Sequence, residues 1–420
     1  MTRFWMTKPW RPLLILSKTM ASDAMPARGS PNCLWRSSEA AIYARHDVLS
    51  ISFGRDRVYT FDLSGRLLTL FRAGDFYQRS LGNSFLHKGR RSDLQSHTQA
   101  LVRFRERLSP KQAEVLLADV WAELSDLHTA LPAGRAQQVM EQLLNWGPEQ
   151  LAEHGRRFEQ IYRPISILPP DQYLSLVLQI SEGCSYNRCA FCNFYKGRPF
   201  KTKSAEEFRQ HVQAVSEFLG PAAAHRKGIF LADGDALMTP QTRLLECLDV
   251  LREVYPNLPL YSFMDAFRPQ AKSLADFRQL ATAGLRRVYL GIETGDSELL
   301  SWLNKPGSPE QMWHEADKIR QAGLGLGLIF MVGAGGQTYA ERHRQASLAW
   351  LQRFAPGTDD LIFLSEFIPH PDQPYAAAAS EAGVTPLSPA ELAAELRLWR
   401  QGLADLKAKV VPYHLQEFIY

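Results

Sequence analysis

Three cysteines, Cys184, Cys189 and Cys192, lie within nine residues in the stretch GCSYNRCAFC, and the chain has only two others. Cysteine thiolates bind zinc or an iron-sulfur cluster. A structural zinc site needs a fourth cysteine or histidine, but no second cysteine pair follows, and the nearest downstream histidine, His211, lies in a predicted helix. Three thiolates with an open fourth position favour a 4Fe-4S cluster whose remaining iron can bind a substrate or cofactor.

The two remaining cysteines indicate no further site. Cys247 shares helical spacing with Leu244, Leu248 and Leu251, which is typical of a small core residue. Cys33 lies in a stretch without a periodic pattern and has no evident partner. An odd number of cysteines with three clustered does not indicate a disulfide framework, so we expect a reducing, cytoplasmic compartment.

The cysteine cluster follows the first of six predicted strands. Apolar runs alternate with helical patterns from residue 173 onward, and each run is followed by a helical segment. The runs cover residues 174–180, 228–232, 260–264, 287–293, 327–333 and 361–368. This alternation predicts an α/β fold with a parallel sheet covered by helices, and six units are too few for the common eight-unit barrel. We therefore expect a partial (β/α)6 parallel barrel that binds ligands at the carboxyl ends of its strands.

Acidic and glycine-rich segments follow the later strands at that same edge. The second strand is followed by an acidic turn, the fourth ends in an acid, and the fifth is followed by glycine. The candidate residues are Asp233, Gly234, Asp235, Glu293 and Gly333. A carboxylate can accept hydrogen bonds from an ammonium group, and glycine lets the backbone approach a flat ligand. A dinucleotide fingerprint is excluded after the fifth strand, because it requires a third glycine where the chain has Thr338.

Residues 173–370 resemble the radical S-adenosylmethionine (SAM) superfamily. That family has the motif C-x3-C-x2-C with an aromatic residue before the last cysteine, a place that Phe191 occupies here, although the first gap holds four residues. By this resemblance, residues 232–235 stand where the family holds the SAM amino group. Gly291-Ile292-Glu293-Thr294-Gly295 is similar to a segment near the SAM ribose or methionine, and residues 330–338 to a turn that approaches adenine.

The resemblance implies an enzyme that binds a 4Fe-4S cluster and SAM. It would cleave SAM with an electron from a flavodoxin- or ferredoxin-type donor, and the 5′-deoxyadenosyl radical would abstract hydrogen from an unknown substrate. No clustered cysteines for an auxiliary cluster and no D-x-H-x-x-G cobalamin segment are present. Two alternatives remain open: a non-catalytic iron-sulfur or zinc-binding module, and an RNA-modifying member of the same superfamily.

The region before the barrel is predicted to be an N-terminal α+β extension. Residues 58–71 read as two strands around a turn at Ser64 and Gly65, and residues 109–128 as a helix capped by Ser109, with a second helix over 133–146. We expect a loosely structured tail over 1–35, the α+β domain over 36–165, the barrel over 173–370 and a C-terminal helical extension over 371–420.

The charge distribution gives little information about partners. The chain has 48 basic and 44 acidic residues, a balance that does not favour nucleic acid. Residues 91–108 are locally basic, and we interpret them as a surface helix. His370, after the sixth strand, could contact a substrate, but a loop histidine of this kind is typically solvated. No apolar run reaches the roughly 18 to 20 residues of a membrane helix, and the basic first 32 residues fit neither a signal nor a transit peptide.

Overall fold

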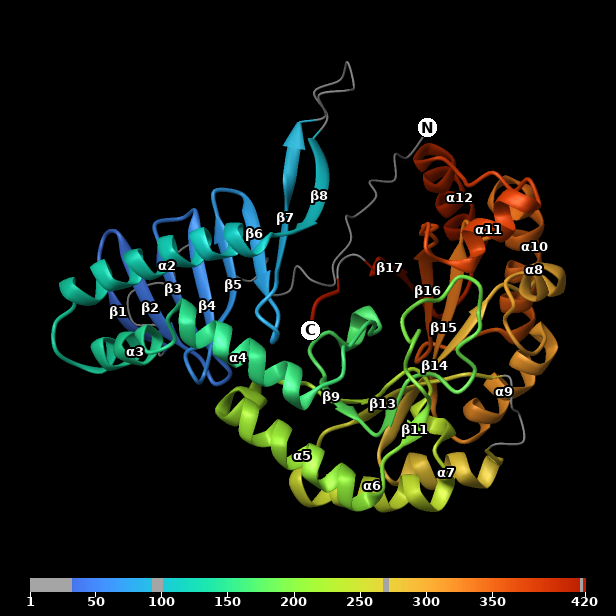
Figure 1. The fold of residues 1–420 in the computed structure, drawn as a ribbon, viewed down its shortest axis with the longest axis horizontal. Helices are drawn as coiled ribbons and strands as arrows, with labels where there is room; N and C mark the ends of the chain where they lie inside the picture. The colour runs from blue at the N-terminus through green and yellow to red at the C-terminus, as the bar shows by residue number, and fades with distance from the viewer. Residues whose placement is uncertain (1–31, 93–100, 267–271, 416–417) are drawn as a thin grey trace, which may run out of the picture. The chain divides into compact units, whose positions relative to one another are not determined.

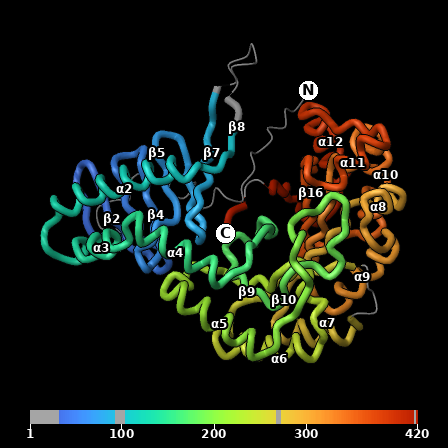
Figure 2. The backbone as a smooth tube through the Cα atoms, in the orientation of Figure 1, coloured from blue at the N-terminus to red at the C-terminus, as the bar shows by residue number. Residues whose placement is uncertain are grey.

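The computed structural model describes residues 32–92, 101–266, 272–415 and 418–420. The chain divides into two compact units (Figures 1 and 2). The first comprises residues 1–156 with Ile419 and Tyr420, and the second comprises residues 157–418. The tail expected over residues 1–35 lies outside the described residues up to residue 31, and a strand begins at Cys33.

The first unit is built on an eight-stranded antiparallel sheet whose strands pair in chain order. The predicted pair of strands around Ser64 and Gly65 is confirmed as β4 and β5. The strands are β1 (Cys33–Arg36), β2 (Ala40–Ala44), β3 (Val48–Phe53), β4 (Arg57–Asp62), β5 (Leu67–Arg72), β6 (Asp75–Arg79), β7 (Phe85–Ser92) and β8 (Leu101–Arg107). Gly65 is required at its turn, because its φ is 97° and a Cβ there would lie 2.9 Å from the Gln142 carbonyl oxygen.

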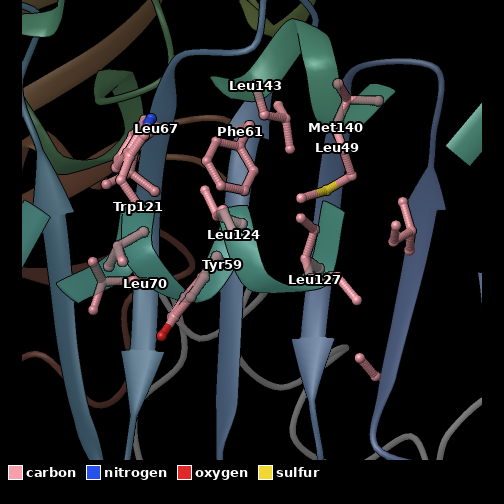
Figure 3. Packing of buried hydrophobic residues seen from close by; sticks show 14 of the residues in the cluster. Leu49, Tyr59, Phe61, Leu67, Leu70, Trp121, Leu124, Leu127, Met140 and Leu143 are labelled. Carbon is pink, nitrogen blue, oxygen red and sulfur yellow. The ribbon is translucent and has the colours of Figure 1, made fainter. Parts of the chain in front are cut away.

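Helices pack on one face of this sheet. They are α2 (Pro110–Ala130), α3 (Arg135–Leu144) and α4 (Pro148–Ile161). The predicted cap of α2 is confirmed: the Ser109 hydroxyl accepts from the Gln112 backbone N–H in a capping box. Figure 3 shows the core that forms between the two layers, with Tyr59 and Phe61 from the sheet facing Leu124 and Met140 from the helices. The strand face with alternating apolar residues is therefore buried by the helices.

The interpretation of residues 91–108 as a surface helix is wrong. Residues 101–107 form β8, which pairs antiparallel with β7, and residues 93–100 lie outside the described part. In the sequence LVRFRER, Arg103 and Arg105 alternate with Phe104 and Glu106. This period of two places the two kinds of residue on opposite faces of the sheet, as in a strand.

The second unit contains a seven-stranded parallel sheet in the order β17-β16-β15-β14-β13-β12-β9. All six predicted strands are present. The strands are β9 (Leu176–Gln179), β12 (Ile229–Ala232), β13 (Leu260–Met264), β14 (Leu285–Glu293), β15 (Gly325–Val332), β16 (Leu361–Glu366) and β17 (Lys409–Tyr413). Among the described strands, β9 and β17 form the two edges, so the sheet is an open, partial barrel. The predicted α/β fold class with an N-terminal α+β extension is confirmed.

The seventh strand, β17, lies in the segment that we expected to be a helical extension. It extends the sheet in parallel beside β16. Pro412 interrupts the strand pattern in the sequence, and proline is tolerated on an edge strand because one side of the backbone needs no partner. The segment therefore contains two helices followed by a strand.

Helices separate the strands of the second unit and begin at clear sequence signals. Capping boxes at Ser204, Ser273 and Ser388 begin three of them. The helices are α5 (Ala205–Leu219), α6 (Gln241–Val254), α7 (Leu274–Thr282), α8 (Ser297–Trp302), α9 (Pro309–Gln321), α10 (Gly336–Phe354), α11 (Pro374–Glu381) and α12 (Pro389–Gly402). Short elements complete the unit: η1 (Pro170–Gln172), η2 (Gly220–His225), η3 (Ala236–Met238), β10 (Ser181–Glu182) and β11 (Lys201–Thr202). No helix of the described residues is long and apolar enough to span a membrane.

Candidate cofactor site

The three clustered cysteines lie on one loop between β10 and β11. These two short strands pair antiparallel, with Ser181 opposite Thr202 and Glu182 opposite Lys201, so the loop is closed at its base. Gly183, directly before Cys184, has a φ of 78°, and a Cβ there would lie 2.9 Å from the Arg198 carbonyl oxygen. The two ends of the loop therefore approach each other at a position that only glycine fits.

The four-residue gap between Cys184 and Cys189 has a defined structure. Asn187 takes the left-handed conformation with a φ of 52°, which asparagine tolerates, and its side-chain amide donates to the Tyr195 carbonyl at 2.8 Å. The backbone N–H groups of Tyr186 and Asn187 donate to the Cys184 sulfur. Hydrogen bonds of this kind stabilise a thiolate, although burial has the larger effect on the pKa of Cys184 and raises it.

Burial makes the free thiols weak acids. It raises the pKa of Cys189 to about 12 and that of Cys192 to about 11, and it also raises the pKa of Cys184. The positive charge of Lys305 acts in the opposite direction on the pKa values of Cys189 and Cys192. A metal or cluster binds the deprotonated thiolate, and the charge of Lys305 favours that form of Cys189 and Cys192.

Lys305 is a buried cation that we did not identify from the sequence. Its Nζ lies 3.1 Å from Asp265 Oδ2 and 3.7 Å from Glu293 Oε1. Burial alone would lower the pKa of Lys305, but the carboxylates of Asp265 and Glu293 outweigh burial and raise it well above its usual range. Lys305 is therefore a permanent positive charge beside the cysteine loop.

Asp265 was also missed, although it follows β13 at the same edge of the sheet as the predicted acids. Its Oδ2 contacts Lys305, whereas its Oδ1 is buried with no hydrogen-bond partner among the described residues. A buried carboxylate oxygen without a donor is costly, and a donor from a water molecule or a ligand would offset that cost. The position of a charged residue directly after a buried strand was the available signal.

Asp235 connects the cysteine loop to this charged group. It accepts hydrogen bonds from the Ser185 hydroxyl and from the Asp265 backbone N–H, the latter at 3.0 Å. Burial, and then the negative charge of Asp265, raise the pKa of Asp235 to about 7. Gly234 beside it makes room for an aromatic ring, because a Cβ there would lie 2.5 Å from the Tyr195 ring.

Asp233 holds both ends of the cysteine loop. Its Oδ1 accepts from Gln179 Nε2 at 3.0 Å, and its Oδ2 accepts from the Gly183 backbone N–H at 3.1 Å. The Arg198 guanidinium lies 3.4 Å from Oδ2. Gly183 precedes Cys184 and Arg198 follows Cys192, so this buried carboxylate positions the loop. Its contact with a cofactor stays a prediction.

Glu293 ends β14 in a strained conformation. Its φ is 63°, its side chain is buried, and burial raises its pKa. A Cβ on Gly291 would lie 2.3 Å from Glu293 Oε1, so this glycine is needed for the carboxylate to reach Lys305. Strain of this kind in a non-glycine residue is held by the surrounding structure and is characteristic of functional sites.

Helix α10 fixes the segment that follows Glu293. The His343 Nε2 donates to the Met331 carbonyl at 3.1 Å, so its Nδ1 accepts from the Thr294 hydroxyl at 2.7 Å. Gly295 packs against the backbone of α10, since a Cβ there would lie 2.5 Å from the Ala346 carbonyl oxygen. Arg342 forms two hydrogen bonds to Asp296, at 2.5 and 2.8 Å.

Phe191, Gly333 and His370 have less direct evidence for a role. Phe191 packs against an apolar cluster that includes Met331 and Ala334 at the end of β15. Gly333 has a φ of 93°, and this backbone conformation alone explains why glycine occupies the position. His370 is exposed. Cofactor binding by Phe191 and Gly333 stays a prediction.

The donor set consists of three cysteine thiols, which are the ligand type of iron-sulfur clusters. In the described ranges, no group of three or more His, Cys, Asp or Glu residues is arranged to hold one metal ion. A single zinc needs its ligands to converge, with sulfur at about 2.3 Å. A 4Fe-4S cluster takes cysteine thiolates as ligands, and three thiolates leave one of its four irons open.

A comparison with protein families identifies a part of the second unit. Residues 178–349 match the family model described as the radical SAM superfamily. This range contains the three cysteines, Asp235, Asp265, Glu293 and Lys305. A comparison with curated protein sequences gives no match.

Solved structures give distant similarities. The cobalamin-dependent SAM radical enzyme OxsB is 19% identical with a TM-score of 0.37, over 50% of this chain and 30% of OxsB. Coproporphyrinogen III oxidase (HemN) from Escherichia coli is 16% identical with a TM-score of 0.41, over 59% of this chain and 55% of HemN. The chain thus spans less than two thirds of either protein. Methylornithine synthase (PylB) is 16% identical with a TM-score of 0.40, over 70% of this chain and 78% of PylB.

Proposed function

We propose that this chain, whose residues 178–349 match the radical SAM superfamily model, is an enzyme that binds a 4Fe-4S cluster and cleaves SAM. The observation that carries the proposal is the arrangement at the strand ends. Three thiols on one closed loop lie beside a buried ammonium group, and the charges of Lys305 and of the neighbouring acids act on them. We assign Cys184, Cys189 and Cys192 as the cluster ligands.

When bound, the cluster and SAM supply one-electron cleavage of a carbon-sulfur bond and hydrogen abstraction from a substrate. The residues of the chain hold and neutralise these groups. Lys305 offsets the negative charge of the thiolates, and Asp233 and Asp235 fix the loop that carries them. The three cysteines are only partly buried, whereas Asp233, Asp235, Glu293 and Lys305 are buried.

The charge balance of the side chains around Lys305 favours a cationic ligand. Three carboxylates, those of Asp235, Asp265 and Glu293, surround one ammonium group, that of Lys305. SAM carries a sulfonium and an ammonium group, which reduce this excess of negative charge. The buried Oδ1 of Asp265 is an acceptor in position for such a ligand.

Reductive cleavage of SAM tests the proposal. The purified chain would be reconstituted anaerobically with iron and sulfide, reduced with dithionite in place of the proposed flavodoxin or ferredoxin, and mixed with SAM. We expect 5′-deoxyadenosine and methionine as products. Cys192→Ala should abolish them, whereas Cys247→Ala, which alters a buried core cysteine of α6, should retain them.

Two outcomes would contradict the proposal. Formation of 5′-deoxyadenosine by Cys192→Ala at the wild-type rate would show that the cluster is held elsewhere. A wild-type protein that binds a 4Fe-4S cluster but does not cleave SAM would be a binding module.

A further inference from the structure

The β7–β8 hairpin of the first unit carries a continuous basic face. Antiparallel register places Lys88 directly opposite Arg105 and Arg90 directly opposite Arg103. Directly opposite residues share a face of the sheet, and residues two apart on one strand also share it. Arg107, two residues after Arg105 on β8, lies on the same face. We call these five residues the basic face: Lys88, Arg90, Arg103, Arg105 and Arg107.

Like charges directly opposite each other destabilise a strand pair, and no acid lies on this face of the two strands among the described residues. Arg90, Arg103 and Arg107 are exposed. The opposed and exposed side chains of Arg90 and Arg103 therefore repel each other, and an anionic partner would offset this repulsion.

The opposite face of the same hairpin provides an internal contrast, because acids lie among its cations. His87 lies 3.4 Å from Asp75 and 3.3 Å from Glu106. Arg91 pairs with Glu106 at 3.0 Å and lies over the Phe104 ring at 3.8 Å. The concentration of like charge on one face is thus a property of that face and not of the hairpin's composition.

Aromatic side chains continue the basic face across the sheet. Phe76 pairs with Lys88, and Phe71 pairs with Phe76, so one row across four strands reads Phe71, Phe76, Lys88 and Arg105. Both phenylalanines are partly exposed and neither belongs to the core cluster of the unit. A sheet with cations beside accessible aromatic rings is the arrangement on which unpaired bases stack while phosphates are neutralised.

We propose that this face binds single-stranded RNA. The phosphates would lie along the cations of β7 and β8, and bases would stack on Phe71 and Phe76. Thr69 and Gln78, paired on the same face, offer hydroxyl and amide groups for the ribose 2′-OH. The aromatic rings favour RNA over two other anionic partners. Neither a lipid surface nor an acidic peptide has bases that would stack on rings aligned with the cations.

Binding of a labelled oligouridine to the full chain, with and without the cluster, tests the inference. We expect salt-dependent binding that does not require the cluster, so failure here is distinguishable from failure of SAM cleavage. Arg90→Gln/Arg103→Gln should weaken binding roughly tenfold and reduce the salt slope by about 1.4, because each phosphate that is no longer neutralised lowers it by about 0.7. The control Arg55→Gln/Arg91→Gln removes two charges from the β3–β4 turn and the opposite face, and should change binding less than about twofold.

Stacking is tested separately by Phe76→Leu. It should weaken binding roughly fivefold with an unchanged salt slope, because the ring contributes without charge. The inference is overturned if the wild-type chain does not bind oligouridine at low salt, or if both double variants lose affinity equally. It is also overturned if oligodeoxythymidine, anionic vesicles or a polyglutamate peptide bind as tightly as the RNA, or if Phe76→Leu binds like wild type.

Discussion

The two units place positive charge in opposite environments. In the second unit, Lys305 is buried and has carboxylates at 3.1 and 3.7 Å. In the first unit, Arg90 and Arg103 are exposed and lie directly opposite each other on adjacent strands. The charge of Lys305 is compensated by carboxylates of the same chain, whereas Arg90 and Arg103 repel each other.

This difference distinguishes a charge that organises the fold from one that is available to a partner. A buried ammonium group must be compensated within the chain, so removing it leaves carboxylates unpaired. Exposed arginines contribute little to stability and can be removed at little cost. Stability measurements can therefore separate the two roles before any ligand is identified.

The largest effect is expected from Lys305→Met in the chain without cofactors. It leaves Asp265 and Glu293 buried without a cation, so the free energy of unfolding in urea should fall by about 3 to 5 kcal/mol at neutral pH. The loss should shrink as the pH falls below neutral, because burial raises the pKa of Glu293 and favours its neutral form. A loss below about 1 kcal/mol would mean that Lys305 is not the compensating charge.

A smaller effect is expected from Asp233→Asn. The amide cannot accept at both oxygens, so either the Gln179 or the Gly183 hydrogen bond is removed, together with the charge that faces Arg198. We expect a loss of about 1 to 3 kcal/mol in the free energy of unfolding and faster loss of iron to a chelator from the reconstituted protein. Glu206→Gln, at an exposed position on α5, is the control and should match wild type in both measurements. Equal iron loss in both variants would contradict the positioning role of Asp233.

A third effect, which depends on pH, is expected from His343. Burial lowers its pKa to about 4, below the value of about 6.5 expected in the unfolded chain. Its contribution to stability is therefore complete above pH 6.5 and is lost as the pH falls toward 4, by up to about 1.4 kcal/mol per pH unit. His343→Gln should flatten the dependence of unfolding free energy on pH in this window. His46→Gln, at a side chain that is 84% exposed, should leave the slope unchanged, and an unchanged slope in His343→Gln would refute the assignment.

The smallest effect on stability is expected from Arg90→Gln/Arg103→Gln. Removing two opposed like charges should leave the free energy of unfolding unchanged or raise it by less than about 1 kcal/mol. Added salt should stabilise the wild-type hairpin more than the variant, because salt screens the repulsion. Urea unfolding at low and high salt measures both effects. A loss above about 1 kcal/mol would give these arginines a structural role and remove the contrast with Lys305.

Much of the barrel was predictable because its signals are local. Each of the six expected strands is an apolar run, and Ser204 begins α5 with the capping box that its spacing to Glu207 indicates. β17 was missed because Pro412 interrupts a run of only five residues. The prediction of a surface helix for β8 rested only on the number of basic residues. The alternation of arginine with Phe104 and Glu106 indicates a strand.

The candidate site was predictable only in part, because its residues are distant in the sequence and come together only in the folded chain. The cysteines and the acids after β12 and β14 stand out at strand ends. Lys305 follows a helix, and its position beside Asp265 depends on how that helix returns to the sheet. The basic face was hidden for a related reason: a near-balanced total charge says nothing of how strand register sorts Arg90 and Arg91 onto opposite faces.

The most direct test of the central claim is electron paramagnetic resonance of the reconstituted, reduced protein, with iron measured on the same samples. The account predicts about four irons per chain in wild type and in Cys247→Ala, with a 4Fe-4S signal that changes when SAM is added. Cys189→Ala should lose the signal. A signal that Cys189→Ala retains, or one that SAM leaves unchanged in wild type, would contradict the assignment of an open cluster site to Cys184, Cys189 and Cys192.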